Sequence, residues 1–205
     1  MTTFAWPTGD SAFSQFSAAV WKPKQIAFES ESPLNGDVQT TTRPGGRWGW
    51  QLHFFSQTWA ERRRVIAFLE RLNGREHRIS FIDPANPSPQ GTIALTGVTV
   101  STSAAQFAQS LVLANCGAGA TLLRGDWIKV GTQSLKVVAD ATADGSGVMT
   151  VTVRNMLRAA VSAGAAVTTN NVSSLFVLAD PNWSAAFNPG NIADPFTIDL
   201  IEVFS

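Results

Sequence analysis

The chain has 205 residues, of which 44% are hydrophobic and 15% charged, and its formal net charge is +0. A chain of this length forms one large domain or two small ones. The apolar content excludes a disordered chain, which would be poor in apolar residues and rich in charge. The neutral balance excludes strong nonspecific attraction to DNA or membrane lipid. Low charge also indicates that some apolar surface is buried against partners.

The single cysteine and the N-terminal residues exclude further kinds of protein and site. Cys116 is the single cysteine, which excludes an intramolecular disulfide framework and an all-cysteine zinc or iron–sulphur site within one chain. This usage fits synthesis in a reducing cytoplasm. We expect no signal peptide, because residues 1–7 lack a basic region and a continuous apolar stretch. No window approaches the roughly 18 consecutive apolar residues of a membrane span, so we expect no membrane insertion.

The first 47 residues contain an aromatic segment and a pair of strands. Residues 1–24 have no clean periodicity and are expected to form an arm that docks elsewhere; their large aromatic residues are Trp6, Phe13, Phe16 and Trp21. Residues 25–29 are predicted to form a strand and residues 38–43 a returning strand. Between them, residues 31–37 supply proline and Asn-Gly turn chemistry.

A strand–helix–strand unit follows. Residues 47–55 alternate strictly between apolar and polar, which predicts a half-buried strand. Thr58 and Glu61 have the spacing of a capping box, so a helix is expected to begin there and cover the strand. Its apolar face would contain Arg62, Val65, Ile66, Leu69 and Leu72. Asn73-Gly74 is expected to end it, and residues 75–83 resume as a strand.

Two proline-rich stretches indicate that the remaining chain is divided. Residues 83–91 contain three prolines and block regular structure. Residues 92–180 hold five or six short strands with glycine-rich turns, which predicts a small β-barrel or β-sandwich. Residues 180–191 form a second linker-like stretch. The last strand, residues 196–204, is apolar on both faces near its end, and its simplest place is beside the strand at 47–55.

The predicted fold class is therefore mainly β with one prominent helix, an α+β belt module joined to an inserted small barrel or sandwich. We assign residues 1–91 and 181–205 to the belt module and 92–180 to the insert. Such an insertion is tolerated because the ends of a domain commonly lie close together at its surface.

A search for catalytic or metal chemistry assigns no catalytic, cofactor-binding or metal-binding residue. His53 and His77 have no third ligand at a metal-site spacing, and Cys116 has no histidine partner in a recognisable triad pattern. Asp140 and Asp144 lack the pattern of a calcium loop, so we expect a turn there. We predict that the protein is not an enzyme and needs no cofactor. A cell-wall hydrolase stays as a third hypothesis, to be tested at the two histidines and the cysteine.

Arginine and tryptophan are the residue types that suggest contact with partners. An arginine-rich helix face is either solvated or meets acidic surfaces of neighbouring subunits. Seven tryptophans occur with no tyrosine, and those in irregular segments are candidates for interface anchors. The predicted interface residues are Arg62, Arg63, Arg64, Arg71, Arg75, Trp6, Trp21 and Trp183. We expect Arg64→Glu or Arg71→Glu to weaken assembly more than folding.

The layout resembles the distal tail proteins of long-tailed bacteriophages. The similarity lies in four segments: the Arg-Trp-Gly-Trp sequence at 47–50, the helix at 58–72, the strand at 78–84 and the hairpin-like segment at 123–131. The resemblance implies a hexameric ring in the virion tail, assembled in the host cytoplasm. Its partners would be further copies of itself, the tail tube protein, the tip or baseplate hub and the tail fibres. It implies no specific nucleic-acid binding.

An alternative function is a carbohydrate- or receptor-binding accessory module of a tail or cell surface. In this hypothesis the insert recognises a saccharide, and Trp127 or Trp183 provides the stacking platform. A glycan array probed with the insert would discriminate the two functions.

Overall fold

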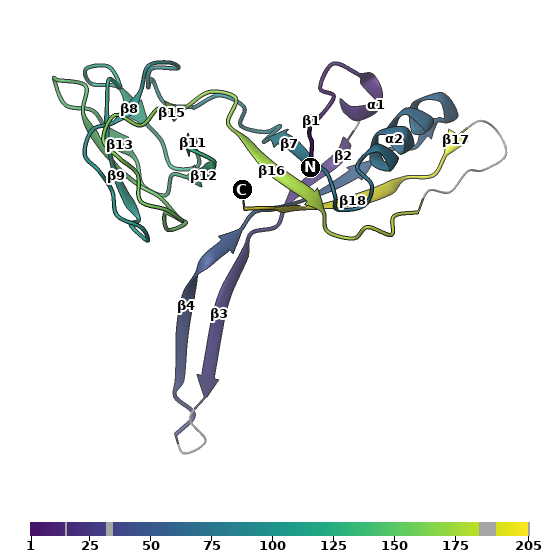
Figure 1. The fold of residues 1–205 in the computed structure, drawn as a ribbon, viewed down its shortest axis with the longest axis horizontal. Helices are drawn as coiled ribbons and strands as arrows, with labels where there is room; N and C mark the ends of the chain where they lie inside the picture. Colours follow the sequence, from purple (N-terminus) through teal and green to yellow (C-terminus); the bar gives the residue numbers. More distant parts are fainter. Residues whose placement is uncertain (15, 32–34, 185–191, 205) are drawn as a thin grey trace. The chain divides into compact units, whose positions relative to one another are not determined.

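The computed structural model describes residues 1–14, 16–31, 35–184 and 192–204, with side chains at all of these except 25–27 and 42–45. Strands predominate in this part of the chain (Figure 1), and α2 (Trp59–Arg71) is its one helix longer than a single turn. The predicted fold class is confirmed. The chain divides into two compact units: Met1–Lys24, Arg47–Phe81 and Leu175–Ser205 in the first, Gln25–Gly46 and Ile82–Ser174 in the second.

The first unit is built on a six-stranded sheet in the order β1-β7-β16-β18-β5-β2. Its elements are β1 (Thr3–Ala5), α1 (Ser11–Ser14), β2 (Phe16–Trp21), β5 (Gly49–Phe54), β6 (Gln57–Thr58), α2, β7 (Arg78–Ile82), β16 (Ser173–Leu178), β17 (Ile192–Ala193) and β18 (Phe196–Glu202). The pair β1 and β7 is parallel, whereas β18 is antiparallel to both β16 and β5. Chain segments far apart in sequence therefore share one sheet.

The pairing of β5 with the C-terminal strand β18 confirms the position predicted for that strand. Ile198 lies opposite Leu52, and Leu200 opposite Trp50. These four side chains are buried, because alternate residues of a strand point to the same face of a sheet. The alternation seen in the sequence thus identified the buried face correctly.

Helix α2 begins at the predicted capping box. The Thr58 hydroxyl accepts a hydrogen bond from the Glu61 backbone N–H at 3.3 Å, and the Glu61 carboxylate accepts one from the Thr58 N–H at 3.1 Å. Val65 and Leu69 are fully buried, as the helical periodicity predicts. After the helix, Asn73 takes a positive φ of 47°, a left-handed conformation that ends it.

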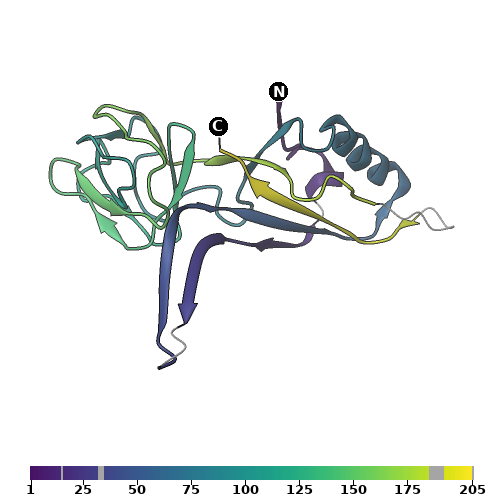
Figure 2. The ribbon, with the colours of Figure 1, turned by 60° about the horizontal axis from the view of Figure 1, so that its bottom comes forward.

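An aromatic cluster around Trp6 joins the helix to the sheet. The Trp6 ring lies 5.7 Å from Phe68 of α2, 6.3 Å from Phe54 of β5 and 5.5 Å from Phe81 of β7, measured between centroids. Figures 1 and 2 show α2 lying over one face of this sheet. The expectation that residues 1–24 form an arm docking elsewhere is wrong for Trp6 and Phe13, which are buried in their own unit.

Strand β16 corrects the boundary drawn after residue 180. The sequence assigned Leu175–Leu178 to the insert, whereas the structure pairs Phe176 with Glu202 and Leu178 with Leu200 in the first unit's sheet. The apolar run of β16 resembles the barrel strands in composition, and composition does not identify the neighbouring strand. Part of the second proline-rich stretch, residues 185–191, lies outside the described residues.

The second unit contains a small barrel whose strand pairing closes on itself. Its strands are β8 (Thr99–Val100), β9 (Ser110–Ala114), β10 (Thr121–Leu122), β11 (Trp127–Val130), β12 (Gln133–Lys136), β13 (Ala141–Thr142), β14 (Met149–Thr152) and β15 (Val167–Thr168). Two three-stranded sheets have the orders β14-β9-β8 and β12-β11-β15. Single bridges, Val137 to Val153 and Thr99 to Ala166, link their ends. The barrel encloses one apolar cluster that includes Leu113, Ile128 and Val151.

The second unit also includes a long β-hairpin made of β3 (Lys24–Glu31) and β4 (Val38–Arg47), which pair only with each other. These strands confirm the two predicted there and extend beyond the predicted ends. Part of the predicted turn, residues 32–34, lies outside the described residues. Every described side chain between residues 28 and 41 is exposed.

Candidate functional site

A hollow of about 430 Å³ in the first unit is lined by three arginines. Arg47 ends β4, Arg75 follows α2, and Arg78 begins β7. The other lining residues are Met1, Val177, Ile201, Val203 and Phe204. Among the described residues, no carboxylate lines this hollow, which we name the arginine pocket.

Contacts within the unit hold the guanidinium groups of Arg47 and Arg75. The Arg47 guanidinium lies 4.4 Å from the centroid of the Phe204 ring, a cation–π distance. Arg75 Nε donates a hydrogen bond of 2.9 Å to the Leu178 carbonyl oxygen. Arg78 Nε is buried and has no hydrogen-bond partner among the described residues. A buried N–H without an acceptor is costly.

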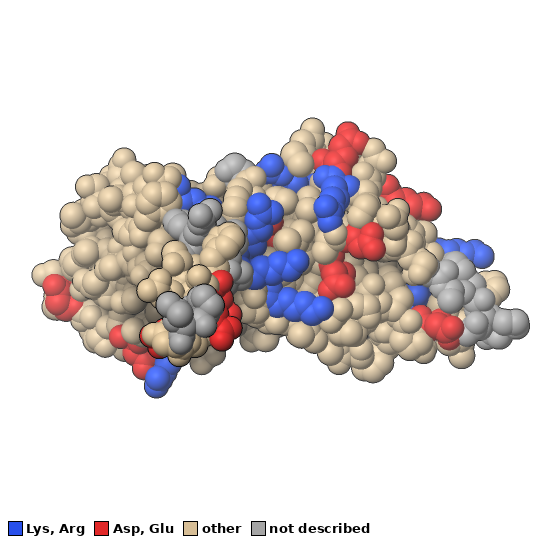
Figure 3. Space-filling model, turned by 90° about the horizontal axis from the view of Figure 1, so that it is seen from below, with Lys and Arg blue, Asp and Glu red and all other residues tan. Residues whose placement is uncertain are grey.

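The charge of the pocket is not balanced by the ion pairs of the described residues. Those pairs are Lys22 with Asp199, Arg64 with Asp10, and Arg124 with Asp140. Figure 3 shows Lys and Arg atoms gathered together on the face seen there. Guanidinium groups bind carboxylate and phosphate oxygens through paired N–H donors. The pocket is therefore suited to an anionic group.

The predicted interface arginines do not form one surface. Arg62 is a correction: it is fully buried in its own unit, donates to the Asp194 carbonyl oxygen at 2.6 Å and lies 3.9 Å above the Phe196 ring. Burial lowers the pKa of the Arg62 guanidinium, and the Asp194 carboxylate opposes this shift. Its place on the helix's apolar face, at 62 before 65 and 69, was the signal that it points inward.

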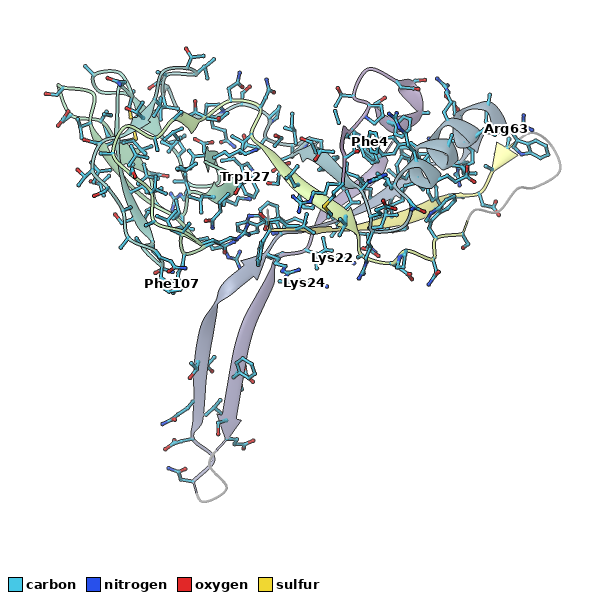
Figure 4. The ribbon with its side chains drawn as sticks, in the orientation of Figure 1. Phe4, Lys22, Lys24, Arg63, Phe107 and Trp127 are labelled. Carbon is cyan, nitrogen blue, oxygen red and sulfur yellow. The ribbon has the colours of Figure 1, made fainter. Side chains whose placement is uncertain are left out.

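The other predicted arginines differ in their surroundings. Arg64 is paired with Asp10 at 2.8 Å, and the Arg71 guanidinium lies 4.1 Å from the Phe4 ring centroid. Arg63, labelled in Figure 4, is exposed, and Arg75 lines the pocket. A role for any of them in assembly stays a prediction.

Sequence reasoning missed Arg47 and Arg78 as site residues. Arg47 occupies the polar side of the alternation at 47–55, and Arg78 was part of the basic group without being placed in the interface. The available signal was that Arg47 begins the strand predicted at 47–55, whereas Arg78 lies within the strand predicted at 75–83. That signal gives no distance between the two strands, so the convergence of the arginines was not visible.

The predicted anchor tryptophans also separate into buried and half-buried ones. Trp6 is a correction, because it is 6% exposed and its ring lies in the aromatic cluster described above. Trp21 is half-buried and packs edge-on against Trp48 and Trp50, at 5.0 and 5.4 Å between centroids. Trp183 is half-buried and lines a second hollow of about 470 Å³ together with Asp180 and Asp199.

Trp127, one proposed saccharide platform, is not available for stacking. It is 6% exposed, its indole N–H donates a 2.9 Å hydrogen bond to the Asp83 carboxylate, and the Lys136 ammonium lies 5.2 Å from its ring centroid. Burial lowers the pKa of Lys136, while Asp83 raises it and Arg154 lowers it further. The side chain of Trp127 (Figure 4) thus serves the packing of the second unit.

The histidines, the cysteine and the aspartate considered as catalytic or metal-binding residues each have different neighbours. His53 Nδ1 is 3.0 Å from the Thr197 hydroxyl, and His77 Nδ1 accepts a 3.4 Å hydrogen bond from the Thr2 backbone N–H. Cys116 is fully buried, and burial raises the pKa of its thiol. Asp144 accepts hydrogen bonds from the Ser146 and Val148 N–H groups, the turn that was predicted.

No group of three or more histidine, cysteine or acidic residues could hold a metal ion in the part of the chain that the structure describes. Nor does any helix there have the length and apolar character needed to cross a membrane.

Neither a protein-family model nor a curated protein matches the chain. The proposals that follow therefore rest on the structure and on the resemblance given above.

Proposed function

We propose that this protein is a structural subunit of a phage tail that associates with copies of itself into a ring. The ring would join the tail tube to the tip or baseplate hub and its fibres. The chain would need no cofactor and would act through its surfaces. Support comes from the architecture, which has the helix-bearing sheet and the separate small barrel that the resemblance implies.

The observation that carries this proposal is the exposed β3–β4 hairpin. Phe28 and Val38 are 54% and 59% exposed. A two-stranded ribbon is marginally stable by itself in water, and each of its strands has one unpaired edge. A long ribbon with exposed apolar side chains is a typical element for contact with another chain. Such an element fits an assembly protein better than an isolated monomer.

The decisive measurement is the mass of the purified protein in solution, together with its presence in virions. We expect a particle of about six copies, visible as a ring in negative-stain images. A protein that stays monomeric at every concentration tested, and that is missing from purified virions, would end the proposal.

A second candidate function is saccharide binding in the Trp183 hollow. Its lining combines a half-buried indole ring with the carboxylates of Asp180 and Asp199 and the hydroxyl of Thr197. An aromatic face beside carboxylates is suited to stacking a sugar ring and accepting its hydroxyl hydrogen bonds. Titration of the whole chain against host cell-wall oligosaccharides tests this. Binding that Trp183→Ala abolishes would support it, and no binding by the unaltered chain would exclude it.

A further inference from the structure

We infer that the arginine pocket receives the acidic outer part of the β3–β4 hairpin of a second copy. This inference rests on the proposed self-association and names the two surfaces that make it. The outer part of the hairpin is defined here by Glu29, Glu31 and Asp37, which are all exposed. Three carboxylates on one copy thus correspond to three guanidinium groups on the other.

The pocket has the chemistry of a carboxylate receptor. Its three arginines converge without a lining carboxylate, and Arg78 Nε is a buried donor without an acceptor among the described residues. Arg75 is exposed, so the pocket is open to an incoming side chain. A carboxylate bound there would accept charge-assisted hydrogen bonds and relieve the repulsion between the guanidinium groups. Val177 and Ile201 supply apolar surface for the stem of a glutamate.

The hairpin carries the matching charge. Neither Glu29 nor Glu31 belongs to an ion pair of the described residues. Asp37 and Asn35 form a side-chain hydrogen bond, and Asn35 Oδ1 also accepts one from the Asp37 N–H at 3.3 Å. These contacts order the backbone beside the turn and leave carboxylate oxygens free to accept further bonds.

The occupant is the hairpin of a second copy, because its exposed carboxylates match the guanidinium groups of the pocket in charge. Val38–Arg47 is one strand, and Arg47 at its end lines the pocket. At ~3.3 Å per residue, Asp37 lies roughly 30 Å along the strand from Arg47. Along this extended segment Asp37 is therefore too far from Arg47 of the same chain to pair with it.

The two surfaces are different, which determines the kind of assembly. A contact between unlike surfaces is head-to-tail, and it repeats from copy to copy until the rotation closes a ring or continues as a filament. Each copy gives one hairpin and receives one. Charge complementarity of this kind is weakened by salt when the groups are partly exposed.

Charge exchange between two variants tests the contact in the full chain. One variant, Glu29→Arg with Glu31→Arg, has a basic hairpin and an unchanged pocket. The other, Arg47→Glu with Arg75→Glu, has an acidic pocket and an unchanged hairpin. Each variant alone presents like charges at every contact, whereas an equal mixture presents opposite charges at every contact in an alternating assembly. Arg124→Glu reverses an exposed arginine outside the pocket and outside the predicted interface, and is the matched control.

Sedimentation measures the assembly, and circular dichroism with thermal unfolding shows that each variant is folded. We expect each variant alone to associate at least about tenfold more weakly than the unaltered chain. The equal mixture should regain the mass of the original assembly, and Arg124→Glu should assemble normally. A third variant with all four changes should assemble by itself, which keeps the test decisive if one double variant folds poorly.

Three results would overturn the inference. Normal assembly of both double variants would show that copies meet elsewhere, and the proposed ring function would stand. If the pocket variant fails to assemble while the hairpin variant assembles normally, the pocket binds another acidic partner and not the hairpin. If the unaltered chain itself stays monomeric, the proposed function falls together with the inference.

Discussion

The barrel and the hairpin of the second unit differ in whether the edges of their strands are paired. In the barrel, bridges at Val137–Val153 and Thr99–Ala166 join the two sheets, so the pairing closes and no long edge is left open among the described strands. The hairpin leaves one edge of each strand unpaired and its described side chains exposed. Open edges are a liability in a monomer and are useful in an assembly. The difference separates a region whose strand edges are closed from a region with open edges, which the proposed contact with another copy would use.

The sheet of the first unit lies between these two cases. It is open, with β1 and β2 at its edges. The first edge strand has 3 residues, and the second has an irregular register between Phe16 and Ala18. Short and bulged edges limit pairing with other chains. This leaves the hairpin, and not the sheet edges, as the element of the described chain with the longest open edges.

The largest expected effect concerns the two separate cores. Leu52 of β5 and Leu113 of β9 are each fully buried, one in each unit. Replacing either with alanine should lower the free energy of unfolding by about 2–5 kcal/mol, because it removes apolar contacts and leaves a cavity. We expect two thermal transitions, each lowered by one variant and not by the other. One transition shifted equally by both variants would mean that the units unfold together. Leu→Met at the same sites is the volume-conserving control.

A smaller effect is expected at the start of α2. Thr58→Ala removes the hydroxyl that accepts from the Glu61 N–H, which should reduce the free energy of unfolding of the first unit by about 1 kcal/mol. Urea unfolding followed by far-ultraviolet circular dichroism measures this. Thr58→Ser keeps the hydroxyl and should be nearly neutral. A loss of the same size in the serine variant would show that the methyl group, and not the cap, is responsible.

The smallest effect on stability is expected in the hairpin. Phe28→Ser with Val38→Ser changes two exposed side chains, so the free energy of unfolding of either unit should move by less than about 0.5 kcal/mol. The same variant should associate more weakly in sedimentation, because the exposed apolar surface is lost. A drop in stability above about 1 kcal/mol would instead show that the hairpin covers part of its own chain.

Local patterns made much of the first unit predictable. The alternation in residues 47–55 identified the buried face of β5, and the spacing of Thr58 and Glu61 located the start of α2. The apolar C-terminal strand was placed beside β5 because it needed cover on both faces, and the register of the pair confirms this. Each of these inferences depends on residues within one or two turns or strands of one another.

Non-local packing accounts for the errors. Trp6 stands in a segment with no periodicity, so its burial between α2 and the sheet had no signal in neighbouring residues. Leu175–Leu178 has the same composition as the barrel strands, and its pairing with β18 was decided by which edge was available. Arg62 was placed on the apolar face of the helix and still assigned to an interface. Its hydrogen bond to the Asp194 carbonyl oxygen shows that the chain itself supplies its partner.

The sequence by itself determined the fold class, the capped helix, the strongest strand and the turn at Asp144. Periodicity, helix caps and turns depend on residues that are close together in the sequence. The tertiary structure alone decided which distant residues meet. One pocket is lined by Arg47, Arg75 and Arg78, which are far apart in the sequence. The hairpin is exposed because no further strand pairs with it. Both are properties of the distances between elements, and a linear pattern of residue types does not contain those distances.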